Sequence, residues 1–226
     1  MLVAIVDDDG DDRLALQDTL DEAEYTTIVR EAPISDTSEL MSWLSDVGAD
    51  AIGCDHFLSG SDYAGFHGAE AMSLIYREMK LPGFLTSAFI ATGGALEIRR
   101  ERQFLPSVVH KGDWSPDVLR HAIEYCAREL GGDIPLGRRA QRTGIEITRF
   151  HSYRRDPVVE AILPGWNPRS SVEFPLDLIQ DEELKTNVVA GQVTWLIAWV
   201  NVGAESAEDL FFLDFEAAPE PLDLGL

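Results

Sequence analysis

Short apolar runs alternate with amphipathic segments over the first 130 residues of the chain. The apolar runs predict strands, at residues 2–6, 25–30, 49–54, 88–91 and 107–110. Between and after them, apolar residues three or four positions apart predict helices, at residues 11–23, 38–45, 68–80, 95–102 and 117–130. Because strands that alternate with helices form βαβ units, we expect a doubly wound α/β fold around a five-stranded parallel sheet.

The pattern changes after residue 131. Strand-like segments then predominate, at residues 144–150, 158–163, 172–179, 192–202 and 210–217, and Gly, Pro, Asn and Asp separate them. No amphipathic helix is predicted in this part, apart from a turn near residues 181–184. We therefore expect a first domain at 1–131, a linker at 132–142, a second, β-rich domain at 143–217 and a tail at 218–226.

The composition is strongly acidic. The 226 residues include 18 Lys and Arg against 40 Asp and Glu, which gives a net charge of −22. Such a chain repels DNA, RNA and anionic lipid, and the charge indicates either a well-solvated surface or a cluster of carboxylates around a cation. Six arginines at 138, 139, 142, 149, 154 and 155 form a basic island, which we interpret as a solvated strand surface or a partner for the acidic first domain rather than a nucleic-acid contact.

Two further features concern location. Cys54 and Cys126 lie in apolar surroundings and have neither disulfide nor zinc spacing, so we interpret them as core residues. The N-terminus lacks the features of a signal peptide, and the longest apolar run, at residues 193–202, is too short to span a bilayer. We expect a cytoplasmic protein without membrane contact.

Residues with reactive side chains follow four of the predicted strands. Asp7 and Asp8 follow the first strand, Asp55 the third, Thr92 the fourth and Lys111 the fifth. The carboxyl ends of parallel strands meet at one edge of a sheet, so we expect these side chains to lie together. Carboxylates held close repel one another unless a cation joins them, and hard oxygen ligands suit Mg²⁺. Such a site could support phosphoryl transfer to a carboxylate, with a lysine and a hydroxyl on the phosphoryl oxygens.

These residues carry a resemblance to the receiver domains of two-component response regulators. It covers about residues 1–130 and rests on Val6-Asp7-Asp8-Asp9, on residues 50–55, on Ala91-Thr92-Gly93 and on Val108-Val109-His110-Lys111. The resemblance implies a flavodoxin-like receiver fold and a phosphoprotein that is not an enzyme. Asp55 would accept a phosphoryl group from a histidine kinase.

The resemblance also implies the other roles at the site. Asp7, Asp8, Asp55 and the backbone carbonyl of Phe57 would hold Mg²⁺, and Thr92 and Lys111 would bind the phosphoryl group. Asp9 is interpreted instead as a cap of the first helix.

The sequence departs from the family pattern near both Asp55 and Lys111. The segment from Asp55 to Gly68 is long, no proline follows Leu58, and Gly112 stands where a proline usually follows the lysine. A pseudo-receiver that serves as an unphosphorylated interaction scaffold is therefore the alternative. A metal-dependent phosphohydrolase is a weaker one, because Phe57 occupies the place of its second acid.

The second domain has neither the helices nor the basic face of common DNA-binding output domains. We therefore expect output by protein–protein contact, with a histidine kinase and other signalling proteins as partners and no DNA. A homodimer is left open.

Overall fold

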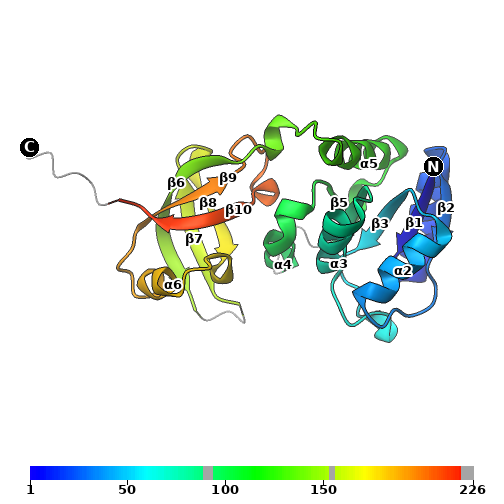
Figure 1. Ribbon diagram of the computed structural model, residues 1–226, viewed down its shortest axis with the longest axis horizontal. Coiled ribbons are helices and arrows are strands. Elements are labelled where there is room, and N and C mark those ends of the chain that lie inside the picture. The colour runs from blue at the N-terminus through cyan, green and yellow to red at the C-terminus, as the bar shows by residue number, and fades with distance from the viewer. Residues whose placement is uncertain (89–93, 153–155, 220–226) are drawn as a thin grey trace, which may run out of the picture. The chain divides into compact units, whose positions relative to one another are not determined.

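The computed structural model describes residues 1–88, 94–152 and 156–219 (Figure 1). The chain divides into two compact units, Met1–Pro135 and Leu136–Leu226. Each unit is built around its own sheet and its own buried apolar clusters, so each is described by itself.

The first unit contains a five-stranded parallel sheet in the order β2-β1-β3-β4-β5. Its strands are β1 (Leu2–Val6), β2 (Thr26–Val29), β3 (Ala51–Asp55), β4 (Gly83–Ser87) and β5 (Val108–His110). All four strand pairings are parallel. This strand order is the flavodoxin-like one of doubly wound folds, in which ligands bind beyond the carboxyl ends of the strands.

Helices cover both faces of this sheet. They are α1 (Gly10–Glu22), α2 (Thr37–Val47), α3 (Gly68–Leu74), α4 (Gly94–Glu101) and α5 (Pro116–Leu130). Side chains from α1 and α5, among them Leu16 and Leu119, share a buried cluster with Val3 and Ile5 of β1. Residues of α2, α3 and α4 pack on the alternate strand residues, which face the other way. The predicted doubly wound architecture is confirmed.

The fourth strand lies earlier in the chain than the sequence suggested. β4 is Gly83–Ser87, whereas the apolar pattern predicted residues 88–91; Ala88 lies in a bend, and the rest of that segment is outside the described residues. The strand ends in Thr86 and Ser87, both fully buried. Buried hydroxyl side chains interrupt the apolar pattern, and for that reason the sequence placed the strand too late.

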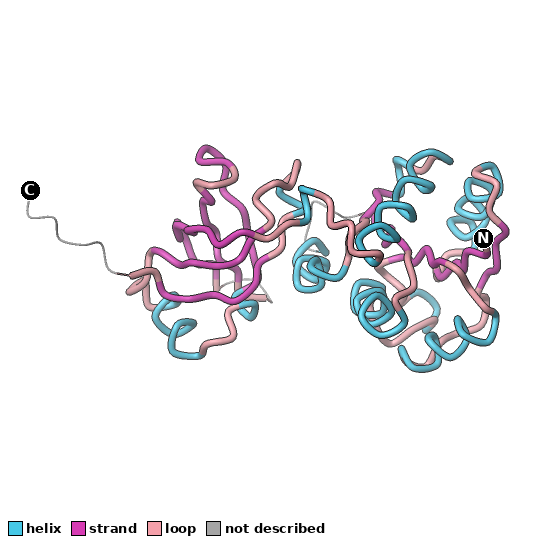
Figure 2. The backbone as a smooth tube through the Cα atoms, turned by 45° about the horizontal axis from the view of Figure 1, so that its top comes forward, coloured by secondary structure: helices cyan, strands magenta, loops and turns pink. Residues whose placement is uncertain are grey.

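The second unit contains a five-stranded antiparallel sheet in the order β10-β9-β6-β7-β8. Its strands are β6 (Gln141–His151), β7 (Val158–Leu163), β8 (Asn167–Pro175), β9 (Trp195–Val200) and β10 (Phe212–Ala217). Figure 2 shows this unit as mostly strand. The predicted β-rich character is confirmed.

Helix α6 (Glu182–Val189) is the element of this unit that the sequence underestimated, since only a turn near residues 181–184 was expected. Asp181 caps it, accepting a hydrogen bond from the Leu184 backbone N–H. Leu184 and Val188 then pack into the same core as Phe174 and the inward residues of the sheet. The helix is short and mostly polar, so its amphipathic pattern is weak in the sequence. No helix among the described residues combines the length and apolar composition that a membrane-spanning segment requires.

Candidate functional site

Three aspartates meet at the carboxyl edge of the parallel sheet. Asp7 and Asp8 directly follow β1, and Asp55 is the last residue of β3. One carboxylate oxygen of each lies within 4.8 Å of the others. Because β1 and β3 are neighbours in register, with Val6 opposite Cys54, the acidic residues that follow them are brought together by the sheet itself.

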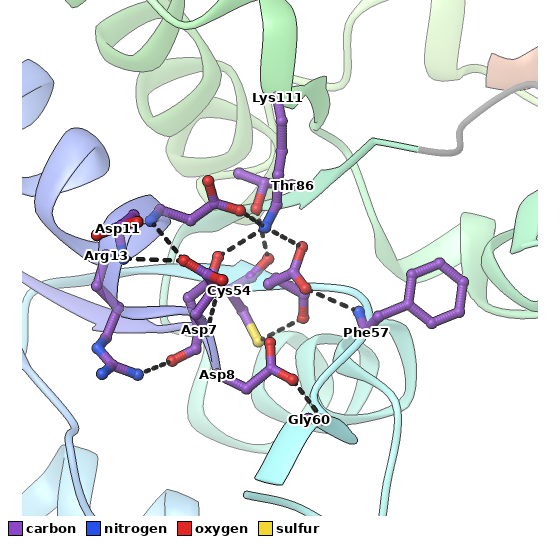
Figure 3. A network of polar contacts seen from close by, with 12 residues as sticks. Asp7, Asp8, Asp11, Arg13, Cys54, Phe57, Gly60, Thr86 and Lys111 are labelled. Carbon is purple, nitrogen blue, oxygen red and sulfur yellow. Dashed lines mark hydrogen bonds and ion pairs between the residues drawn. The ribbon is translucent and has the colours of Figure 1, made fainter.

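Lys111 reaches into this cluster from the end of β5 (Figure 3). Its Nζ lies 2.9 Å from Asp7 Oδ2, 3.1 Å from Asp55 Oδ1 and 2.6 Å from Asp12 Oδ2. Burial alone would lower the pKa of Lys111, but the hydrogen bonds to Asp12 and Asp7 raise it above its ordinary value. The lysine therefore stays charged at neutral pH. Its contact with Asp12, which lies in the first turn of α1, was not predicted from the sequence.

Two of the carboxylates are withdrawn from water. Asp7 is fully buried and Asp55 is 4% exposed. The pKa of Asp55 is raised to about 6, chiefly by burial; the charge of Asp7 contributes to this rise, and Lys111 opposes both effects. Burial also raises the pKa of Asp7, against the hydrogen bond from Lys111. Raised pKa values of this kind are typical of functional sites, where burial and neighbouring like charges shift the titration of catalytic or binding groups.

Backbone N–H groups of the segment after Asp55 hold the carboxylates of Asp8 and Asp55. The Gly60 N–H donates to Asp8 Oδ2, and the Phe57 N–H donates to Asp55 Oδ2 over 3.0 Å. In Figure 3 the Phe57 ring points away from the carboxylates, so only the backbone of Phe57 is available to the site. Phe57 was proposed as a metal ligand through its carbonyl, and its place beside Asp55 leaves that proposal open.

Asp9 has a different role from its neighbours, as the sequence suggested. It is the N-cap of α1, and its carboxylate accepts hydrogen bonds from the backbone N–H groups of Asp11 and Asp12. Both hydrogen bonds lower the pKa of Asp9, and the bond from Asp12 has the larger effect. The interpretation of Asp9 as a helix cap is confirmed.

Glycine is required where α3 approaches the site. A Cβ on Gly68 would lie 1.8 Å from the backbone oxygen of Asp55, and the Gly68 N–H donates to the His56 carbonyl over 2.8 Å. Only glycine allows this close approach of two backbones. The helix start therefore fixes the backbone directly after Asp55.

The hydroxyl that the sequence predicted for the site belongs to Thr92, which lies outside the described residues. Thr86 pairs in register with Asp55 on the neighbouring strand. Neighbouring residues in register point to the same face of a sheet, so the Thr86 side chain lies on the same face as Asp55, with its hydroxyl 3.5 Å from the Cys54 carbonyl oxygen. Thr86 and Ser87 lie upstream of the strand that the sequence predicted at residues 88–91, and for that reason Thr92 was preferred to both.

The donor set fits a hard divalent cation. Asp7, Asp8, Asp12 and Asp55 bring four carboxylates to one place, and Lys111 contacts three of them. Negative charge therefore exceeds positive charge at the cluster. Carboxylate oxygens with room for retained water are the ligands that Mg²⁺ prefers. Asp7, Asp8 and Asp55 are the residues that would hold it.

Comparisons with known proteins describe the fold. No family model and no curated protein matches the chain. Solved structures resemble part of it. The receiver domain of NtrX from Brucella abortus is 17% identical, with a TM-score of 0.44 over 56% of this chain and 98% of that one.

Two further solved structures give the same result. The signal receiver domain of a modulated diguanylate cyclase from Desulfovibrio desulfuricans is 17% identical, with a TM-score of 0.47 over 58% of this chain and 97% of that one. The receiver domain of a Francisella response regulator is 17% identical, with a TM-score of 0.43 over 57% of this chain and 97% of that one. All three of these solved structures are receiver domains. The first unit has a flavodoxin-like strand order, β2-β1-β3-β4-β5, and the second unit contains an antiparallel sheet.

Proposed function

We propose that the protein is a response regulator in which Asp55 accepts a phosphoryl group from a phosphorylated histidine of a kinase, with Mg²⁺ at the site. The observation that carries this proposal is the position of Asp55. Its carboxylate is buried, lies within 4.8 Å of the Asp7 and Asp8 carboxylates and is contacted by Lys111. Such a cluster is costly to fold and has an evident use when a cation and an anionic phosphoryl group occupy it.

The geometry assigns a task to each group around Asp55. With a pKa of about 6 the carboxylate is mostly ionised at neutral pH, so it can act as the nucleophile. The Phe57 N–H orients Oδ2, and Oδ1 lies beside Lys111. A carboxylate oxygen attacks phosphorus, the P–N bond to the donor histidine breaks, and the imidazole nitrogen keeps the electron pair and takes up a proton.

The remaining residues would neutralise the transferred group. Mg²⁺, held by Asp7, Asp8 and Asp55, would supply positive charge to the phosphoryl oxygens. Lys111 would exchange its contact with Asp55 Oδ1 for one with a phosphoryl oxygen, as a point charge on a flexible stem can do. Thr86 would donate its hydroxyl to another.

The experiment is phosphorylation of the full chain by acetyl phosphate with Mg²⁺, followed by intact-mass measurement. Wild type should gain one phosphoryl group, and Asp55→Asn should gain none. Asp117→Asn is the matched control, because Asp117 lies on the surface of α5 in an exposed pair with Arg120. A wild-type protein that behaves like Asp55→Asn would contradict the proposal.

The same measurements separate the alternative. A pseudo-receiver scaffold would take up no phosphoryl group and no beryllofluoride, and calorimetry would show no Mg²⁺ binding that depends on Asp8. The long segment after Asp55 motivates this alternative. In the structure that segment contributes the Gly60 N–H to Asp8, which favours an organised site over a degenerate one.

The second unit is proposed to act by contact with other proteins. Trp195 and Trp199 on β9 are each 42% exposed, and large aromatic side chains are enriched in protein interfaces. The one α-helix among the described residues of this unit, α6, begins with Glu182 and Glu183, which would be repelled from a DNA groove. Fluorescence anisotropy with mixed-sequence duplex DNA at low salt should show no binding, and tight binding would contradict this output.

A further inference from the structure

A second group of potential metal ligands lies in the first unit, apart from the aspartates. His56 directly follows β3, His67 precedes α3 as its N-cap residue, and Glu97 lies in α4. Glu97 Oε2 is 3.3 Å from His56 Nε2 and 3.5 Å from His67 Nε2. Ligand atoms of all three residues lie within 4.8 Å of one another. Three separate segments of the chain therefore aim nitrogen and oxygen ligands at one point.

These polar atoms lack the hydrogen bonds that burial normally requires. His56 is fully buried; its Nδ1 has no hydrogen-bond partner among the described residues, and its Nε2 lies 3.3 Å from Glu97 Oε2 without the geometry of a hydrogen bond. Glu97 Oε2 and His67 Nδ1 are also buried without such a partner in the described part of the chain. A buried polar group left unpaired costs about 1–3 kcal/mol, so such groups call for an explanation.

The imidazole rings of His56 and His67 lie beside each other at Glu97. A neutral imidazole nitrogen offers a lone pair to a cation. The two rings are stacked, with centroids 5.3 Å apart and planes at 30°, so both stay close to Glu97.

We propose that His56, His67 and Glu97 bind a divalent transition-metal ion of the Zn²⁺ class, with water in the remaining position. Bonds of about 2.0–2.2 Å in a tetrahedral site place the ligand atoms roughly 3.3–3.6 Å apart. The two nitrogen–oxygen distances, 3.3 and 3.5 Å, fall in this range without any rearrangement. Imidazole nitrogen favours zinc and its neighbours over Mg²⁺, so the two candidate sites would select different ions.

The site would connect the phosphoacceptor to two helices. His56 is the residue after Asp55, and its backbone N–H donates to the Thr86 carbonyl over 2.9 Å. A bound ion would join this residue to the start of α3 and to α4. Metal occupancy would then restrict movement of α4 relative to Asp55. The proposal concerns other residues than the proposed phosphorylation and does not depend on it.

The test is calorimetric titration of the metal-stripped full chain with ZnCl₂ alone. Wild type should bind one ion at this site. Because loss of residues that merely orient a metal ligand costs about 10–100-fold in affinity, we expect His67→Ala and Glu97→Gln each to weaken zinc binding by more than about 100-fold. Both side chains are partly exposed, at 44% and 35%, so the variants should fold.

Matched controls keep the result specific. His121→Ala and Glu101→Gln change the same residue types elsewhere in the first unit and should bind zinc like wild type. Asp8→Asn should also keep zinc binding while it loses Mg²⁺ binding, which distinguishes the two sites. A thermal unfolding transition like that of wild type would verify that His67→Ala is folded. Zinc binding equal in wild type and in a double His67→Ala, Glu97→Gln variant would overturn the proposal.

Discussion

The two sheets have the same number of strands and differ in where they place charged side chains. In the parallel sheet, the ends of β1, β3 and β5 deliver Asp7, Asp55 and Lys111 to one edge. In the antiparallel sheet successive strands end at opposite edges, so residues at strand ends are dispersed. The two groups of potential metal ligands found among the described residues both lie in the first unit.

The charged contacts show the same contrast. In the second unit Arg142 pairs with Glu216 across β6 and β10, with both side chains more than half exposed. Such a pair costs little and contributes at most about 1 kcal/mol. The Lys111–Asp55 pair is 17% and 5% exposed, so its charges are held at a real desolvation cost. The parallel sheet thus gathers buried charges at one edge, whereas the Arg142–Glu216 pair of the antiparallel sheet lies on the surface.

The largest effect that tests this contrast is expected in the core of the second unit. Phe174 is fully buried, with ring centroids 5.0 Å from Phe212 and 5.2 Å from Phe215. Phe174→Ala should lower the free energy of unfolding of this unit by about 3–5 kcal/mol, because it leaves a cavity among these rings. Urea unfolding followed by tryptophan fluorescence measures the change.

Phosphoryl acceptance should not follow this loss of stability. Under conditions where the Phe174→Ala variant remains folded, uptake of a phosphoryl group on Asp55 should equal that of wild type. Val189→Ala, at a 47% exposed position of α6, is the matched control and should shift stability by no more than about 0.5 kcal/mol. Loss of phosphorylation in the folded Phe174→Ala variant would show that phosphoryl acceptance by the first unit depends on the core of the second unit.

The same contrast explains what the sequence could predict. In the sequence, a short β-branched run that ends in an acidic residue or a lysine predicts a buried strand and also shows where its carboxyl end lies. Asp7, Asp8, Asp55 and Lys111 were therefore found as a group, and the structure brings them together. The parallel order then follows from the alternation of strands and helices.

Contacts that depend on tertiary packing were not visible in this way. Asp12 reaches Lys111 from the first turn of a helix 99 positions earlier. His56 and Glu97 are separated by 41 positions and meet only because α4 packs against the same face as α3. Thr86 and Ser87 were passed over in favour of Thr92, because the fourth strand was predicted at residues 88–91 and not at Gly83–Ser87. The local sequence pattern predicts where strands end, whereas contacts between helices and strands are seen only in the packed structure.

A smaller effect concerns the cost of the buried charge at Asp55. Its pKa rises from 3.8 to about 6 on folding, so the protonated form favours the folded state. That contribution is complete below pH about 4 and is lost as pH rises through about 6. In EDTA, the advantage in unfolding free energy of Asp55→Asn over wild type should therefore grow by about 1–2 kcal/mol between pH 5 and pH 8.

Urea unfolding at several pH values measures this difference, and Asp117→Asn provides the surface comparison, with no such growth expected. Mg²⁺ should reduce the difference at pH 8, because it binds the folded wild type and adds stability by mass action. An advantage that is constant with pH would mean that Asp55 is not a desolvated charge, and the contrast with the exposed Arg142–Glu216 pair would fail.

The smallest effect sharpens the role of Asp8 in the first unit. A Cβ on Gly60 would lie 2.3 Å from Asp8 Oδ2, so Gly60→Ala should push this carboxylate out of its place beside Asp7 and Asp55. We expect Mg²⁺ affinity to fall roughly three- to tenfold, at or below the low end of the range for residues that orient a metal ligand. Stability should change little, because the displaced group is the end of a flexible side chain. Calorimetric Mg²⁺ titration measures the change, and Gly65→Ala is the control, since its Cβ would meet nothing within 4 Å. Equal Mg²⁺ affinity in the two variants would show that Asp8 does not hold the ion.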